Sequence, residues 1–214
     1  MHRRDPREYS KEARSRVEER SYNDAAFLYD AAASGHLMWA HQYRDSEHDQ
    51  YMSAPEFGQS VTYALGSILC YRLSGDQRST YVATRANAAI REISTSELAS
   101  SSAWGTAHEG LCEELLGDVA TFMDNDDPIE HYRRAKSVYE TVENDIGWQA
   151  EVEFGVTIIP LLELSEFLGC SMDDAKRERI RDVSLLERIK WKTEECENLI
   201  SKTLEHGELG EKIF

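Results

Sequence analysis

In residues 21–35, SYNDAAFLYDAAASG, apolar and small side chains recur every three or four positions. This spacing is the period of an amphipathic helix. One face of that helix is made of small and aromatic side chains: Ala25, Tyr29 and Ala32. Gly35 is expected to cap its C-terminal end. The preceding residues 8–20 predict a charged helix that turns Ala13 and Val17 inward.

The helical period continues along the rest of the chain, and recognisable start signals mark several helices. Ser53 and Glu56 have the spacing of a capping box, and Asp127 stands before Pro128 as an N-cap. Pro160 should kink or split the helix that contains it. The expected helices cover residues 53–73, 77–93, 106–124, 128–142, 147–169 and 172–206.

Residues 1–214 are therefore predicted to form a single all-α domain. Its hairpins are antiparallel, at about 6–39, 58–92 and 109–142, and the helices 147–169 and 172–206 follow them. Two architectures stay open, a short repeat-like α-solenoid of stacked hairpins and an irregular helical bundle. With 4 Pro and 12 Gly, the chain has too few turn signals for a β-sandwich.

An internal echo appears when the sequence is shifted by 51 positions. Leu65-Gly66 then falls on Leu116-Gly117, and Tyr81 falls on Tyr132. In each copy we expect the glycine to let a neighbour pack closely, and the aromatic ring to fill the space between the paired helices.

The first hairpin resembles the tetratricopeptide repeat in its pattern of small and aromatic residues: Ala13, Ala25, Tyr29 and Ala32. The Leu-Gly pairs at 65–66 and 116–117 look like the first-helix signature of the same family, although their offset of 51 exceeds the usual period of about 34 residues. The resemblance implies a helical stack that binds another protein in a groove lined by the first helix of each pair.

The net charge of −16 is concentrated in one part of the chain. Residues 97–174 carry 18 acidic residues against 3 basic ones, whereas the flanking segments are close to neutral. Nucleic-acid binding is not expected, because phosphate contacts need clustered lysine and arginine. Two interpretations stay open: a solvated surface adapted to high salt, and a local field that attracts a basic partner.

Candidate metal and catalytic motifs are weak. His108 and Cys112 share a helix face, as zinc ligands do, but no third ligand stands at a suitable spacing. The aspartates of 124–127 lack the glycine and glutamate of a calcium loop. His36, His41 and His48 are interpreted as surface histidines. Nucleophile-elbow and phosphate-loop signatures are missing. No metal, cofactor or catalytic residue is predicted.

The compartment is predicted from the cysteines and from hydropathy. The four cysteines are widely spaced, which indicates reduced and mostly buried thiols. No stretch approaches the roughly 18 apolar residues that would span a membrane. The sequence therefore predicts a cytoplasmic protein without a membrane segment.

Together these patterns predict a non-enzymatic adaptor that presents an acidic groove to a basic peptide or protein. The tetratricopeptide-like geometry implies that five side chains line the groove: Tyr63, Ser67, Glu114, Asp118 and Thr121. Reversing Glu114 and Asp118 to lysine is then expected to weaken binding and to leave the fold intact. The alternative is an immunity- or antitoxin-type inhibitor whose acidic face blocks a basic toxin or nucleic-acid enzyme. An enzyme with an unrecognised site is a third class.

Overall fold

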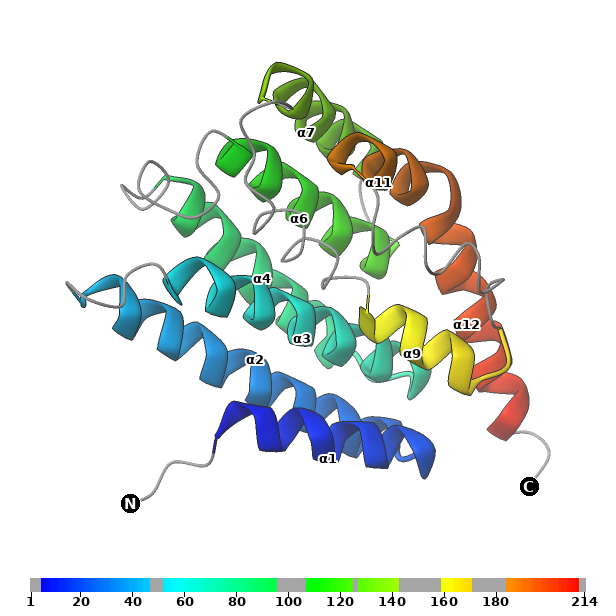
Figure 1. Cartoon of the computed structure of the whole chain (residues 1–214). Helices are drawn as coiled ribbons and strands as arrows, with labels where there is room; N and C mark the ends of the chain where they lie inside the picture. Colours follow the sequence, from blue (N-terminus) through cyan, green and yellow to red (C-terminus); the bar gives the residue numbers. More distant parts are fainter. Residues whose placement is uncertain are drawn as a thin grey trace.

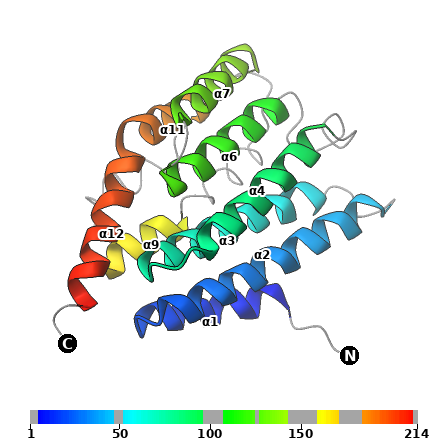
Figure 2. The ribbon, with the colours of Figure 1, turned by 180° about the vertical axis from the view of Figure 1, so that it is seen from behind.

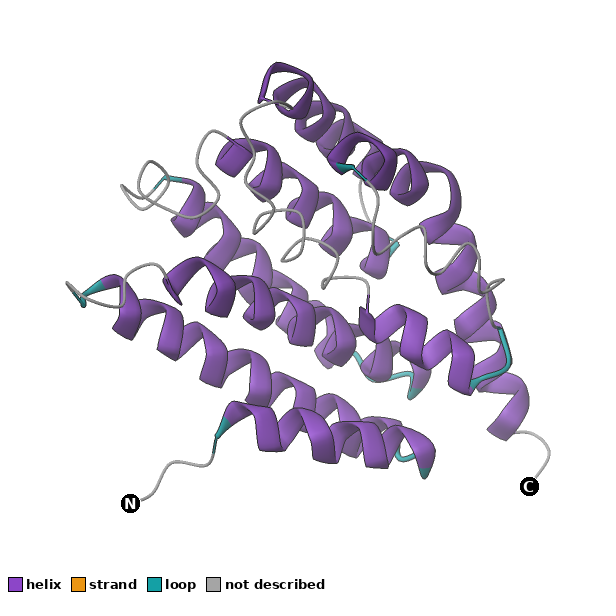
Figure 3. Ribbon diagram, viewed as in Figure 1, coloured by secondary structure: helices purple, strands orange, loops and turns teal. Residues whose placement is uncertain are grey.

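A computed structural model describes residues 5–46, 52–95, 107–124, 127–142, 159–170 and 184–211, and every regular element in these ranges is a helix (Figure 3). The expected all-α class is confirmed. The helices are α1 (Pro6–Glu18), α2 (Tyr22–Arg44), α3 (Ser53–Leu73), α4 (Arg78–Ser94), α6 (His108–Met123), α7 (Pro128–Val142), α9 (Ile159–Phe167), α11 (Leu185–Trp191), the π-helical turn η4 (Lys192–Cys196) and α12 (Glu197–Glu211).

Helices that follow one another along the chain pack side by side from α1 to α7 (Figure 1). Views from opposite sides place α1, α3 and α9 on one side of this stack, and α2 and α4 on the other (Figure 2). The C-terminal helices run across the stack: α11 packs on α7, and α12 contacts α9, α3 and α6. One continuous apolar core joins the helices.

Small side chains hold the first hairpin together. Ala13, Ala25 and Ala32 are completely buried where α1 crosses α2, and Tyr29 fills the space beside them. The expected cap at Gly35 is wrong, since α2 continues to Arg44. Gly35 instead provides space for α1, because a Cβ atom there would lie 2.7 Å from Cγ of Pro6.

The start of α3 differs from its expected capping box. Ser53 Oγ donates a hydrogen bond of 2.8 Å to the carbonyl of Ala40, and Glu56 pairs with His36 of α2. Both side chains therefore bind the neighbouring helix rather than each other's backbone. The N-cap of α7 is as expected, because Asp127 Oδ1 accepts the backbone N–H of Ile129 at 3.1 Å.

The glycines of the internal echo allow close packing, but the aromatic residues behave differently in the two copies. A Cβ atom at Gly117 would lie 2.6 Å from the ring of Tyr132, which is buried. The corresponding Tyr81 is 62% exposed, so that part of the expectation is wrong. Gly66 instead contacts Tyr29 of α2 and Pro160 of α9.

The C-terminal helices are only partly comparable with their expected ranges. Pro160 is the second residue of α9, where a proline fits because the first N–H groups of a helix have no intrahelical acceptor. Residues 147–158 lie outside the described ranges. The expected helix 172–206 appears from Leu185 as α11, η4 and α12, and residues 172–183 are not described.

Replacing Gly117 with alanine tests the close approach of α6 and α7. The added methyl group collides with Tyr132, so we expect a loss of about 1–3 kcal/mol in the free energy of unfolding, measured by urea denaturation. Gly58→Ala is the matched control, because a Cβ atom at Gly58 of α3 has no neighbour within 4 Å. It should stabilise the protein by up to about 1 kcal/mol through helix propensity. Equal effects of the two substitutions would contradict the packing described.

Candidate functional site

Four of the five side chains expected on an open groove are buried. Glu114 and Asp118 are each 1% exposed, and Ser67 and Thr121 are also in the core. Ser67 Oγ donates to the carbonyl of Ala26 at 2.9 Å, which joins α3 to α2. The expectation that these four residues face a partner is therefore wrong.

Tyr63 is the exception, because it is only partly buried. Its ring stacks on Tyr29 and on His36, with ring centroids 6.1 Å and 5.2 Å away. His36 is itself buried, with Nδ1 2.5 Å from Glu56 Oε2, so the interpretation of His36 as a surface histidine is also wrong. Tyr63 thus belongs to an aromatic layer between α2 and α3.

The buried carboxylates of α6 form a neutral cluster of four charges with the C-terminal helices. Arg188 binds both oxygens of Glu114, with Nε to Oε1 at 2.7 Å and Nη2 to Oε2 at 2.6 Å. Lys192 Nζ lies 2.7 Å from Glu114 Oε1 and 2.5 Å from Asp118 Oδ2. The two acids are four residues apart on α6, and the two bases are four residues apart on α11 and η4. The acids therefore lie opposite the bases on successive helical turns. We call these four residues the charge cluster.

Two tyrosines of α7 complete the hydrogen bonding of the charge cluster. Tyr139 donates to Glu114 Oε2 at 2.7 Å, and Tyr132 donates to Asp118 Oδ1 at 3.0 Å. Their rings reach α6 because Gly110 and Gly117 lack side chains. Burial and the adjacent carboxylates raise the pKa of both phenols well above the usual value. They therefore remain protonated donors.

The two carboxylates of the charge cluster titrate differently. Burial alone raises the pKa of Glu114, but the guanidinium of Arg188 and the ammonium of Lys192 outweigh it and hold that pKa at about 2. Burial raises the pKa of Asp118, and Lys192, which Glu114 shares, offsets this only in part. Asp118 is therefore the first of the two to take up a proton as the pH falls.

The charge cluster changes what the double reversal of Glu114 and Asp118 to lysine would do. Four cations would then meet in the core, where an uncompensated charge costs several kcal/mol. The substitution would unfold the protein rather than test a partner surface. The burial of both carboxylates removes the basis for expecting an intact fold.

His108 and Cys112 lie on one face of α6, as expected, with Nε2 and Sγ 3.7 Å apart. Nε2 of His108 is also 3.2 Å from the carbonyl of Ile93, and burial lowers the pKa of this histidine. Within the described ranges, no group of three or more His, Cys, Asp or Glu could hold a metal ion.

All four cysteines are free thiols, and Cys170 is the one that is partly exposed.

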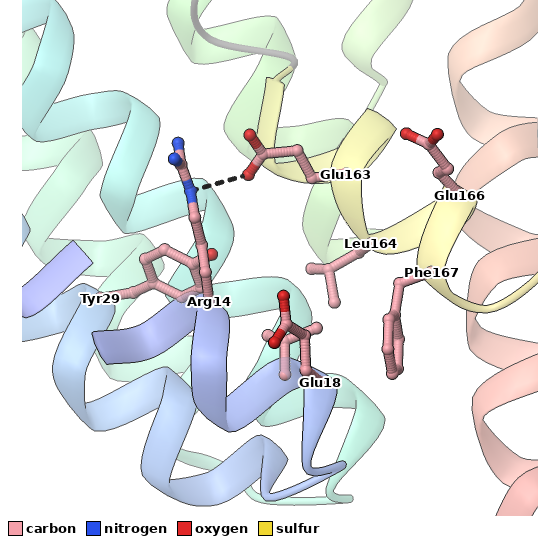
Figure 4. Close-up of a pocket in the computed structure, with 8 residues that line it drawn as sticks. Arg14, Glu18, Tyr29, Glu163, Leu164, Glu166 and Phe167 are labelled. Atoms are coloured by element: carbon pink, nitrogen blue, oxygen red, sulfur yellow. Dashed lines mark ion pairs between the residues drawn. The ribbon is translucent and has the colours of Figure 1, made fainter. Parts of the chain in front are cut away.

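An open cleft of about 340 Å³ lies between α1 and α9, over α2 (Figure 4). Leu164 and Phe167 of α9 point into it, and Phe167 is 37% exposed. Val17 and Tyr29 complete its apolar lining from α1 and α2. The cleft is at the lower end of the size range of ligand pockets and suits one or two side chains.

Charged residues surround this apolar lining with an excess of negative charge. Glu18 of α1 and Glu163 and Glu166 of α9 contribute three carboxylates, against one guanidinium from Arg14. Glu163 points across the gap and pairs with Arg14 at 3.1 Å (Figure 4). Glu166 points away from the apolar side chains. The cleft thus combines apolar surface with a negative field.

A second groove of about 530 Å³ runs between α7 and α11–η4. Its charges are mixed, with three bases and two acids: Arg133, Lys136, Lys190, Glu187 and Glu194. Two of the bases are already paired with neighbours on α7, Arg133 with Glu130 and Lys136 with Glu140. This groove therefore has no strong field of one sign, and the cleft between α1 and α9 is the better candidate site.

The residues of the cleft were not predicted from the sequence. Glu163, Glu166 and Phe167 interrupt an apolar helix at a spacing of three and four, which places them near one another on its surface. That spacing was a usable signal for an acidic edge beside an aromatic side chain. Nothing in the local pattern indicated that α1 would lie opposite.

Glu114→Gln tests the charge cluster, because it leaves two buried cations with one carboxylate. At about pH 7 we expect a loss of about 3–5 kcal/mol in the free energy of unfolding. The pKa of Glu114 is lower in the folded chain than its ordinary value of 4.5, so its contribution is complete above that pH and is lost as the pH falls toward 2. The difference between variant and wild type should therefore narrow in urea titrations at decreasing pH.

The control for this substitution is Glu113→Gln, which changes the residue directly before Glu114. Glu113 is partly exposed and pairs with His131 at 2.8 Å, so its loss should cost under about 1 kcal/mol. A cost of Glu114→Gln no larger than this control would contradict the burial and pairing described.

Helix hydropathy and three comparisons with known proteins bear on identity. None of the described helices is long and apolar enough to cross a membrane. Comparison with protein-family models, with curated proteins and with solved structures finds no match to this chain.

Proposed function

We propose that this protein is a non-enzymatic scaffold that binds a partner protein in the cleft between α1 and α9. The observation that carries the proposal is the apolar lining of the cleft beside three carboxylates and one guanidinium. The partner segment that fits is basic and partly apolar. Its aliphatic or aromatic groups would cover Phe167, which is 37% exposed, and its cations would face Glu18 and Glu163.

The chemistry of the lining favours binding over catalysis. Its eight side chains include no Ser, Thr, Cys or His. The acid–base groups that it does contain are three carboxylates and Tyr29, and one of the carboxylates is paired with Arg14. A long aliphatic side chain with a cationic end, as in arginine or lysine, matches a surface that is apolar below and negative at its edge. Complementary charge would also raise the association rate.

The architecture supports a scaffold in two ways. Neighbouring hairpins are stacked, as in repeat proteins, which use such stacks as extended binding surfaces. The first hairpin also buries the small and aromatic residues that resemble a tetratricopeptide repeat. We therefore keep the proposal of a tetratricopeptide-like, cytoplasmic adaptor. The carboxylates lie around a hollow, which favours an adaptor over an inhibitor, because an inhibitor would present a convex acidic face.

Phe167→Ser tests the cleft as the binding surface. We use a fluorescent synthetic peptide of alternating arginine and leucine and compare it with glutamate–leucine and serine–leucine peptides. The wild type should bind the arginine peptide best, and binding should weaken as salt screens the charges. Loss of the Phe167 ring should reduce the affinity about tenfold, since burial of such a side chain contributes at least ~1.5 kcal/mol. Fluorescence anisotropy measures the dissociation constants.

Phe27→Ser is the matched control. Phe27 is 61% exposed on α2 and does not line the cleft, so its loss should leave peptide affinity unchanged. Circular dichroism checks that both variants stay folded. Equal binding of the three peptides, or equal effects of the two phenylalanine substitutions, would overturn the proposed function.

A further inference from the structure

One ion pair spans the cleft and occupies part of its negative surface. Arg14 of α1 extends toward α9, and its Nε lies 3.1 Å from Oε2 of Glu163 (Figure 4). The backbone contacts of α1 are chiefly with α2, and those of α9 are with α3 and α12. The pair therefore crosses the cleft from one wall to the other.

The position of this guanidinium is the one that a partner's cation would take. Arg14 is the one base among the eight lining residues, and it pairs with the carboxylate that points across the gap. We propose that Arg14 is an internal competitor for the cleft, so that a partner's arginine or lysine must displace it from Glu163. This inference rests on the proposed function, because it concerns how the same site is regulated.

The exposure of the pair makes such an exchange feasible. The side chains of Arg14 and Glu163 are 50% and 36% exposed, so water and salt screen their attraction. Exposed pairs of this kind contribute little to stability. By contrast, Arg188 and Glu114 in the charge cluster are each 1% exposed and form a bidentate ion pair. That pair is inaccessible to a ligand. An incoming guanidinium could replace Arg14 with a similar charge-assisted bond and add apolar contact.

Displacement of Arg14 would also make the electrostatic potential in the cleft more negative. With its guanidinium turned to solvent, the lining loses its one base, and the position beside Glu163 becomes accessible to another cation. A neutral or acidic segment gains nothing from this exchange, because it supplies no cation for Glu163. The ion pair would therefore exclude such segments while a basic segment can enter, which makes the competitor a source of selectivity.

Arg14→Gln tests the inference with the alternating arginine–leucine peptide as the probe. The variant should bind this peptide roughly three- to fivefold more tightly at low salt, since one exposed ion pair no longer has to be broken. Lys11→Gln is the matched control: it removes one positive charge from an exposed position on the same helix, outside the cleft. It should change the affinity much less.

Glu163→Gln provides the complementary test, because it removes the acceptor of both cations. This substitution should weaken peptide binding. Glu140→Gln is its control and should leave binding unchanged. Glu140 forms an exposed ion pair with Lys136 but lies on α7, outside the cleft. Circular dichroism and melting temperature check the fold of all four variants.

The outcomes separate this inference from the proposed function. Suppose that the wild type binds the peptide and that Arg14→Gln binds it no more tightly than Lys11→Gln does. The inference that Arg14 competes with the partner is then overturned, and the proposed binding function of the cleft is unaffected. If Arg14→Gln binds more weakly than wild type, Arg14 assists the partner, which also overturns the inference. If neither wild type nor Arg14→Gln binds the arginine peptide, the proposed function fails, and the competitor fails with it.

Discussion

The bidentate contact between Glu114 and Arg188 is the interaction on which the C-terminal half of the structure depends. It fixes α11 against α6 and is continued one turn later by Lys192 and Asp118. After Lys192, η4 continues into α12, which packs on α9. In turn, Pro160 of α9 packs against Gly66 of α3. Because α9 forms one wall of the cleft, the buried charges indirectly set the position of the candidate site.

The excess negative charge of residues 97–174 has more than one role in this fold. Glu114 and Asp118 are neutralised inside the protein by bases from the C-terminal segment. Others are paired at the surface, as Glu130 is with Arg133 and Arg134. The carboxylates of α9 are part of the same acidic block and border the cleft. A count of acids along the sequence therefore overstates the net negative charge that this block presents at the surface.

The sequence allowed the helices to be predicted, but not the tertiary contacts of the charge cluster and of the candidate site. The 3.6-residue period gave α1, α3, α4, α6 and α7 within a few residues. Glu114 and Asp118 share a face with Leu111 and Phe122, so periodicity did indicate that they are internal. The tetratricopeptide-like geometry instead predicts them on an open groove. Their burial could not be predicted from the sequence, because a buried carboxylate is costly and its compensation by Arg188 depends on tertiary structure. Likewise, Tyr81 and Tyr132 occupy equivalent positions in sequence, yet Gly66 is already covered by Tyr29 and Pro160.

Glu114 and Arg188 form one neutral unit inside the protein, and a double-mutant cycle measures how strongly they interact. Glu114→Gln and Arg188→Met each leave an uncompensated buried charge, whereas the double variant leaves none from this pair. The free energies of unfolding of wild type, both single variants and the double variant are measured by urea denaturation. We expect the double variant to lose at least about 2 kcal/mol less than the sum of the two single losses. Losses that add to within about 0.5 kcal/mol would show that the two residues do not interact and would contradict this expectation.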